Sequence, residues 1–215
     1  MRILKLALAS IAMLLTLNAC SNNMYNVDLR SPVKVVSNNQ SGPRICIADV
    51  TDNRVFGGSE AKPEQPSGIV LSPDYKARVY ARLKNLIGDH TGAMLVPEGK
   101  TIASLVKDIL TQALTEDGFT VVENADLNDP STITMAVSVK NFWSWTSMDK
   151  VNSDIISDIE LDVYTQTNNG QQHINLKNRQ TRKVLTDTRT LYKTTTEASL
   201  ANIYHLACEK FKNIR

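Results

Sequence analysis

The chain has 215 residues, of which 42% are hydrophobic and 21% are charged. This length suits one domain with a substantial hydrophobic core. The 24 basic and 22 acidic residues leave a formal charge of only +2, so the chain lacks the cationic excess that drives nucleic-acid binding.

Residues 1–19 have the three parts of an export signal. Arg2 and Lys5 form a short basic head, residues 6–17 are uncharged and mostly apolar, and a small residue directly precedes Cys20. A helix of about 12 residues is too short for a hydrocarbon core of roughly 30 Å, so we expect a cleaved signal and no permanent span. Its removal leaves 22 basic against 22 acidic residues.

The segment LNAC, which ends at Cys20, resembles the lipobox of bacterial lipoproteins. The resemblance implies that the Cys20 thiol receives a diacylglyceryl group and that the new amino terminus is acylated, for example with palmitate. Stable anchoring needs about two acyl chains, so three would make the attachment permanent. Ser21 replaces the aspartate typical of inner-membrane retention, which implies the periplasmic face of the outer membrane. The alternative is an ordinary signal that happens to precede a cysteine.

The rest of the chain divides by composition. Residues 20–43 are rich in Ser, Asn, Pro and Gly and predict a lipidated, flexible tether with one edge-strand piece at residues 33–36. Residues 44–215 form a single α+β periplasmic domain. Within it, residues 58–87 predict an insertion made of a long loop and a short amphipathic helix over residues 73–87.

That short helix has two alternative roles. Its basic residues either contact anionic headgroups or form the solvated side of a helix packed on its own domain. The apolar stripe that predicts it consists of Tyr75, Val79, Leu83 and Leu86.

Four further elements follow from local patterns. A strand is expected at residues 45–50 and a short one at residues 93–96. Residues 102–114 repeat apolar side chains at helical spacing, and Gly118 suits the left-handed position that ends a helix. Residues 119–122 return as a strand.

A longer strand is expected from residue 133 onward, because apolar and polar residues alternate. The same parity continues to Trp143 and Trp145, which predicts that both tryptophans point to the face carrying the core. Asn168-Asn169-Gly170 then predicts a β-hairpin between two alternating runs.

Two registers of this hairpin keep its apolar and polar faces intact. We expect the register in which Val163 faces Leu176, and a slip of two residues, which pairs Leu161 with Leu176, is the alternative. The polar face of the first strand carries a row of carboxylates that would lie opposite Lys177 and Arg179, which argues against a metal site. The row consists of Asp158, Glu160 and Asp162.

The chain is expected to end with a strand over residues 182–191 and a helix that starts at a capping box, Thr194-x-x-Glu197. The fold class is therefore α+β: an antiparallel sheet, built as a meander with the NNG hairpin, with two helices packed on one face and a loop/helix insertion. The stripe of the final helix consists of Leu200, Ile203, Ala207, Cys208 and Phe211.

This order of elements resembles the YajG-like uncharacterised bacterial lipoproteins. The resemblance covers residues 45–57 and 88–213, and its marks are ADVTDNR in the first strand and loop, GFTV after the helix, and the NNG hairpin. About thirty extra residues around 58–87 depart from the compact form of the family. The resemblance implies an outer-membrane location and this fold, and the family has no assigned chemistry to carry over.

Catalytic signatures are absent from the sequence. The histidines are scattered and form no HExxH or Cys-His spacing, and no GxSxG segment appears. Asp49, Asp52 and Arg54 cluster at the end of the first strand, where they form either an acid/base pair or an ion pair that anchors the loop. We expect no enzyme activity, no cofactor and no metal. The three histidines are His90, His173 and His205.

The two cysteines of the mature domain are Cys46, in the first strand, and Cys208, in the last helix. They are expected as two separate buried thiols, and a disulfide is the alternative in an oxidising compartment.

Two functions remain. The first is a tethered periplasmic adaptor that binds another envelope protein through the polar sheet face, an exposed strand edge or the insertion. The second is a lipid- or hydrophobe-binding accessory of an envelope transport system, whose groove would be lined by aromatic side chains. These aromatic residues are Phe142, Trp143, Trp145 and Tyr164.

Overall fold

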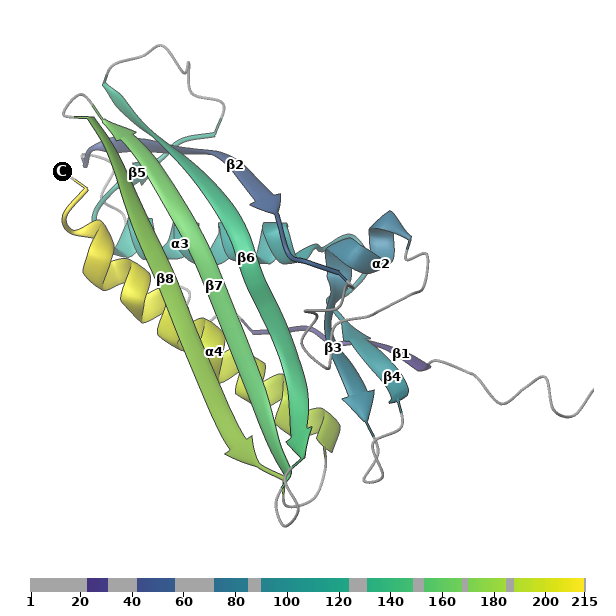
Figure 1. Cartoon of the computed structure of the whole chain (residues 1–215). Coiled ribbons are helices and arrows are strands. Elements are labelled where there is room, and N and C mark those ends of the chain that lie inside the picture. The colour runs from purple at the N-terminus through teal and green to yellow at the C-terminus, as the bar shows by residue number, and fades with distance from the viewer. Residues whose placement is uncertain are drawn as a thin grey trace, which may run out of the picture.

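A computed structural model describes residues 23–30, 42–56, 72–84, 90–123, 131–148, 153–167, 170–184 and 188–214. One mixed sheet of eight strands lies against two long helices (Figure 1). The strands are β1 (Asn23–Asn26), β2 (Arg44–Asp52), β3 (Val79–Lys84), β4 (His90–Leu95), β5 (Thr120–Val121), β6 (Thr132–Met148), β7 (Ser153–Thr167) and β8 (Gly170–Lys183). The helices are α2 (Pro73–Arg78), α3 (Ile102–Glu116) and α4 (Thr188–Phe211). No helix in these ranges is long and apolar enough to cross a membrane.

The α+β class is confirmed, but the sheet is not a purely antiparallel meander. Only β6, β7 and β8 follow one another as antiparallel neighbours, together with the β3 and β4 pair. In contrast, β2 runs parallel to β5 and β6, and β1 runs parallel to β4. Parallel partners come from distant parts of the chain and share no tight turn, so no local signal marks them.

β6 organises the sheet, because β7 covers one of its edges and two strands share the other. β2 pairs with its first half, from Thr132 to Val139, and β3 meets its second half at Ser144. Between these two contacts a β-bulge interrupts the pairing of β6 with β7, since Val139 faces Leu161 while Asn141 faces Glu160.

The bulge overturns the predicted parity of the tryptophans. One extra residue, Lys140, moves every later side chain of β6 to the opposite face. Phe142 therefore joins Val139 in the main core beneath the helices, while Trp143 and Trp145 belong to a separate cluster on the other face.

The predicted helix over residues 102–114 is confirmed as α3. Thr101 and Ser104 form a capping box at its start, and Gly118 adopts a φ of +85° after its end. All members of the predicted stripe are buried in the main core: Ile102, Leu105, Val106, Ile109, Leu110, Ala113 and Leu114.

The final helix is longer than predicted. α4 begins at Thr188, so the expected strand over residues 182–191 is wrong from Thr188 onward, and Thr194 and Glu197 lie inside the helix rather than at its cap. Its first half buries hydroxyl groups instead of an apolar stripe, which explains the error. Thr196 Oγ1 lies 2.7 Å from Ser144 Oγ on β6, and the Tyr192 hydroxyl lies 2.7 Å from Thr146 Oγ1.

The segment expected to form the insertion helix divides into two elements. α2 occupies only Pro73–Arg78, and β3 then enters the sheet with Val79, Leu83 and their neighbours buried. A strand covered on both faces loses its alternation, so its apolar residues fell at helical spacing by coincidence. Residues 57–71 and 85–89 lie outside the described ranges, so of the predicted insertion only this part is placed, and it belongs to the core.

The hairpin adopts the alternative register, because Leu161 faces Leu176 and Thr167 faces Gly170. The expected pairing of Val163 with Leu176 is therefore wrong by two residues. Both registers bury the same side chains, so the hydrophobic pattern did not separate them. Gly170 has a φ of +118°, which supports the need for glycine after the turn.

The predicted tether is wrong over residues 23–30. This segment forms β1 and then crosses toward the helices, where Leu29 is buried in the main core. The edge-strand piece at residues 33–36, the signal over residues 1–19 and Cys20 lie outside the described residues.

Candidate functional site

The face of β6, β7 and β8 opposite the helices, which we call the outer face, carries a row of ion pairs. Arg179 Nη2 lies 2.6 Å from Asp158 Oδ2, and Lys177 Nζ lies 2.6 Å from Glu160 Oε2. Both pairs join directly opposed residues of β7 and β8. The prediction that basic residues neutralise the carboxylate row is confirmed, with partners set by the observed register.

The third carboxylate, Asp162, is held by hydrogen bonds. Asn175 Nδ2 donates to Asp162 Oδ1 at 3.0 Å, and His173 Nε2 lies 2.9 Å from the same oxygen. The hydrogen bond from Asn175 is the main reason why the pKa of Asp162 lies below its ordinary value. The hydrogen bond to Glu160 likewise raises the pKa of Lys177. These contacts stabilise the charged forms of Asp162 and Lys177, so both groups present fixed charges at neutral pH.

One end of the outer face lies near the β7–β8 hairpin. There the Tyr164 ring stacks on His173, with ring centroids 4.7 Å apart. A shallow hollow of about 540 Å³ lies beside them, between β8 and the end of α4. It is lined by Gln172, His173, Ile174, Asn175, Lys210 and Asn213.

β8 forms an edge of the sheet. It spans 14 residues and pairs only with β7 within the described parts of the chain. Most of its side chains are exposed, and α4 reaches its backbone through Lys210 Nζ, which donates to the Asn175 carbonyl at 2.7 Å. A strand edge of this kind presents backbone donors and acceptors to another chain.

The predicted aromatic groove is not assembled. Trp143 and Trp145 are buried against Val79, Ala93 and Leu95, which fill the space that a ligand would need. Phe142 points to the helix side, and Tyr164 lies further along the sheet, opposite Ala136. Phe142 and Trp143 are consecutive residues of one strand, so they point to opposite faces of the sheet and cannot line one groove.

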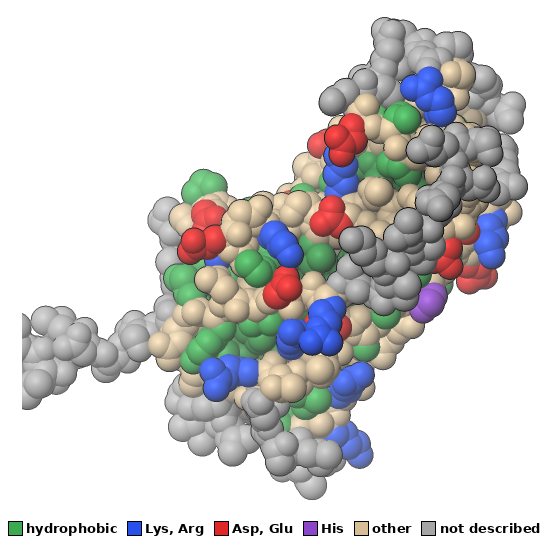
Figure 2. Space-filling model, turned by 180° about the vertical axis from the view of Figure 1, so that it is seen from behind, with side chains coloured by type: hydrophobic (Ala, Val, Ile, Leu, Met, Phe, Trp, Pro, Cys, Tyr) green, Lys and Arg blue, Asp and Glu red, His purple; other side chains and the backbone are tan. Residues whose placement is uncertain are grey.

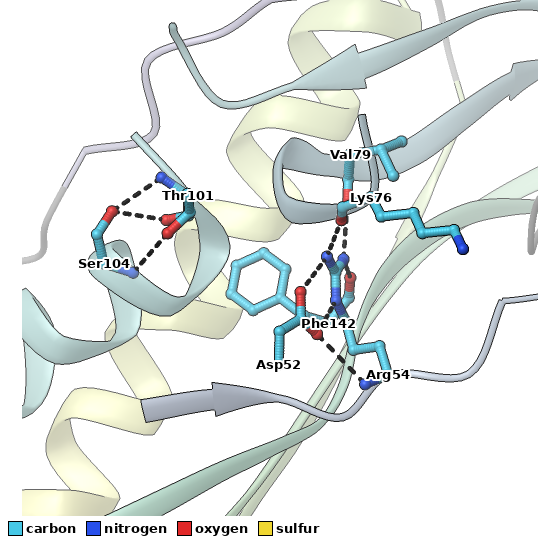
Figure 3. A network of polar contacts seen from close by, with 7 residues as sticks. All are labelled: Asp52, Arg54, Lys76, Val79, Thr101, Ser104 and Phe142. Carbon is cyan, nitrogen blue, oxygen red and sulfur yellow. Dashed lines mark hydrogen bonds and ion pairs between the residues drawn. The ribbon is translucent and has the colours of Figure 1, made fainter. Parts of the chain in front are cut away.

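Arg54 joins three elements at the point where β2 leaves β6 and β3 replaces it (Figure 3). Its guanidinium donates to the carbonyls of Val79 at 2.6 Å, Lys76 at 2.7 Å and Phe142 at 3.3 Å. The Asp52 carboxylate accepts hydrogen bonds from Arg54 Nε at 2.8 Å and from Arg54 Nη2 at 2.7 Å. The Arg54 side chain is 0% exposed.

This arrangement decides between the two interpretations of the cluster after the first strand. Asp52 and Arg54 form an ion pair that anchors the loop, because every guanidinium nitrogen is occupied by backbone or carboxylate oxygens. Asp49 stands apart and accepts a hydrogen bond from Thr51. The Arg54 guanidinium carbon lies over the Trp143 ring, 4.8 Å from the ring centroid. Arg54 therefore also orders the tryptophan cluster.

The remaining candidate residues are dispersed. His90 begins β4, His173 belongs to the outer face, and His205 is exposed on α4. Cys46 is buried and Cys208 is partly buried, and both are free thiols. Burial raises the pKa of Cys208 to about 11, so this thiol stays protonated at neutral pH. In the described ranges no group of three or more His, Cys, Asp or Glu side chains is placed to hold a metal ion.

No family model matches the chain, and no curated protein matches it. Solved structures that align with it include a DUF330-family protein from Xanthomonas campestris, with 10% identity, coverage of 88% of this chain and 93% of that chain, and a TM-score of 0.48. An uncharacterized protein aligns with 13% identity, coverage of 89% and 99%, and a TM-score of 0.49. A minor lipoprotein from Acinetobacter baumannii aligns with 9% identity, coverage of 51% and 84%, and a TM-score of 0.38. These likenesses are distant and carry no conclusion about what this chain does.

Proposed function

We propose that this protein is a lipid-anchored lipoprotein of the bacterial outer membrane whose periplasmic domain binds another envelope protein and performs no catalysis. The anchor is proposed on the LNAC segment that ends at Cys20. The finer assignment to YajG-like lipoproteins is proposed on marks that now have places in the fold. ADVTDNR lies in β2 and just after it, GFTV connects α3 to β5 and enters it, and NNG joins β7 to β8.

The single observation that carries the binding role is the open edge of β8. A partner that adds an extended segment to this edge would form backbone hydrogen bonds along it, which is a common mode of peptide recognition. The ion pairs of the outer face lie directly beside the edge and fix a pattern of charges. Such a pattern contributes specificity and register more than affinity.

The polar groups of the outer face suit binding better than catalysis. Asp158, Glu160 and Asp162 are each engaged by a basic or amide side chain that stabilises the carboxylate. A general acid or base instead needs a pKa tuned toward neutral pH. The hydrophobe-binding alternative loses its support, because the two tryptophans fill their own cluster.

The test is site-specific photocrosslinking in cells with the whole lipidated chain. A photoreactive residue replaces Gln172 or Thr181, both exposed on β8, and the control replaces Lys107, which is exposed on α3. We expect the same discrete protein adduct from both β8 positions and none from position 107. Equal adducts from all three positions, or none from β8, would contradict the proposal.

A charge exchange sharpens this test. The double variant Glu160→Lys with Lys177→Glu keeps an opposite pair at these facing positions but inverts its direction across the two strands. We expect unchanged thermal stability and a weaker β8 adduct, since the partner reads the pattern of charges. An unchanged adduct would show that the outer face takes no part in recognition.

A further inference from the structure

The position of β1 limits how the domain can sit on a membrane. β1 pairs with β4 from its first residue, with Asn23 opposite Gly92 and Asn26 opposite Leu95. A Cβ added at Gly92 would lie 2.4 Å from the Asn23 carbonyl oxygen, a contact that real side chains do not make. The absence of a side chain at Gly92 therefore allows β1 to approach β4 closely at its very start.

The residues after β1 are also fixed to the domain. Arg78 Nη2 donates to Asn26 Oδ1 at 2.6 Å, and the Val27 amide donates to the Leu95 carbonyl at 2.8 Å. Leu29 is buried in the main core, and the Arg30 amide donates to Glu197 Oε1 on α4 at 2.9 Å. Residues 23–30 are thus an integral part of the fold and provide no reach.

The distance from Cys20 to β1 is short. Asn23 is the third residue after Cys20, and an extended chain advances at most about 3.6 Å per residue, so the two are separated by no more than about 11 Å. The headgroup layer of a leaflet is itself roughly 5–8 Å thick, given a hydrocarbon core of about 30 Å and a bilayer of about 40–45 Å. Little chain remains to separate the domain from the lipid.

We propose that the start of β1 is the membrane-contacting end of the domain, and that it rests on the phospholipid headgroups. This inference depends on the lipid anchor at Cys20 proposed above. The contact surface consists of exposed Asn23, Met24 and Thr91, with Lys84 at the adjacent end of β3. Met24 is 62% exposed, and its flexible apolar side chain suits the boundary between headgroups and acyl chains.

This orientation places the hairpin end of the β8 edge far from the bilayer. β3 meets β6 at Ser144. The β7–β8 hairpin lies near Thr134 of β6, because Thr134 pairs with Gln166 at the end of β7. Ten residues of β6 separate these points, which corresponds to roughly 33 Å. Figure 1 shows the β1 strand and the hairpin at opposite ends of the molecule.

Figure 2 shows the molecule from behind the view of Figure 1. On this side, acidic and basic side chains are interspersed without a patch of one sign among those drawn in colour.

Fluorescence quenching on vesicles tests the orientation. The full lipidated protein carries the substitution Cys208→Ala, and a fluorophore is attached at either Met24→Cys or Gln171→Cys, since Cys46 is buried. The vesicles contain phosphatidylethanolamine, phosphatidylglycerol and a phospholipid with a nitroxide on its headgroup. We expect quenching at position 24 to be several-fold stronger than at position 171, and equal quenching would overturn the inference.

Two variants identify the short link as the cause. Insertion of about 20 Gly/Ser residues after Ser21 provides a mean reach of roughly 25 Å and should reduce the quenching at position 24 toward that at position 171. Gly92→Ala should act in the same direction by displacing β1, whereas Glu98→Ala, at an exposed position just after β4 and outside the contact surface, should not. Quenching that the insertion leaves unchanged would count against the inference.

Mass spectrometry of the purified protein used for quenching distinguishes failure of the orientation from failure of the lipid anchor. If the chain is acylated and quenching is equal at both positions, the orientation is wrong and the anchor stands. If the chain carries no acyl group, the anchor is wrong, and the orientation that rests on it is wrong too.

Discussion

The β6–β7–β8 meander and the ribbon formed by β1, β4 and β3 are held together in different ways. The meander joins neighbours in sequence through long antiparallel ladders, and its outer face pairs charges across strands. The ribbon adds β1, from a distant part of the chain, to the neighbouring strands β3 and β4, and buried arginines bind backbone carbonyls in and beside it. Arg54 reaches Val79, and Arg78 donates to the Val96 carbonyl at 3.2 Å.

This difference shows where single side chains matter. A long ladder distributes its stability over many pairs, so removing one exposed pair costs little. The junction of β2, β3 and β6 depends on one buried guanidinium that satisfies several oxygens at once. Its loss leaves buried acceptors and a carboxylate without their donor.

The largest expected effect is at this junction. Arg54→Met should lower the free energy of unfolding by about 3–5 kcal/mol, because Asp52 and the carbonyl groups lose their buried partner. The matched control is Lys177→Ala on the outer face, where the Lys177 side chain is 55% exposed and the expected loss is at most about 1 kcal/mol. Urea denaturation of both variants measures the difference in the free energy of unfolding. Equal losses would contradict the contrast between the Arg54 junction and the outer face.

An intermediate effect is expected at the hairpin. Gly170→Val should destabilise the domain by about 1 kcal/mol or more, because a β-branched residue resists the observed φ of +118°. A Cβ at this position meets no atom within 4 Å, so the strain comes from the backbone alone. Gln171→Val, at the next exposed position of β8, is the control. Thermal melting that does not distinguish the two variants would refute this assignment of the turn.

The smallest effect is expected at Asp162 and depends on pH. Its folded pKa lies below the ordinary value of 3.8, chiefly because Asn175 donates to the carboxylate, so its contribution to stability is present above that value and is lost as pH falls through the folded pKa. Asp162→Asn should therefore be less stable than the natural protein at pH 7, by less than about 1 kcal/mol. The gap should close as the pH falls from 3.8 through the folded pKa, and a gap that widens in acid would contradict the assignment.

The same contrast explains which features were predictable from sequence. The NNG turn and the alternation around it are local, so the hairpin, its faces and the neutralised carboxylates followed from the sequence. The choice between the two hairpin registers did not follow from the sequence, because Val163 and Leu161 both satisfy the apolar pattern opposite Leu176. The bulge at Lys140 has no local mark, and it accounts for the wrong placement of Trp143.

Of the ribbon, the strand expected at residues 93–96 is part of β4, whereas β1 and β3 were missed for a physical reason. β1 pairs with β4 and β3 meets β6, both far along the chain, and the stability of these short strands comes from tertiary contacts that composition does not reveal. The first half of α4 was missed because its buried side is polar, as at Thr196. Of the candidate site, the ion pair of Asp52 and Arg54 followed from proximity in sequence, whereas the open edge of β8 depends on the topology of the whole sheet.

The most direct test of the account is mass spectrometry of the mature protein purified from membranes, supported by the fractionation of Cys20→Ser. The account predicts a chain that begins at Cys20 and carries the mass of a diacylglyceryl group and an amide-linked fatty acid, and a variant that leaves the membrane or keeps its signal. An unmodified thiol at Cys20, or a chain that begins at another residue, would contradict it.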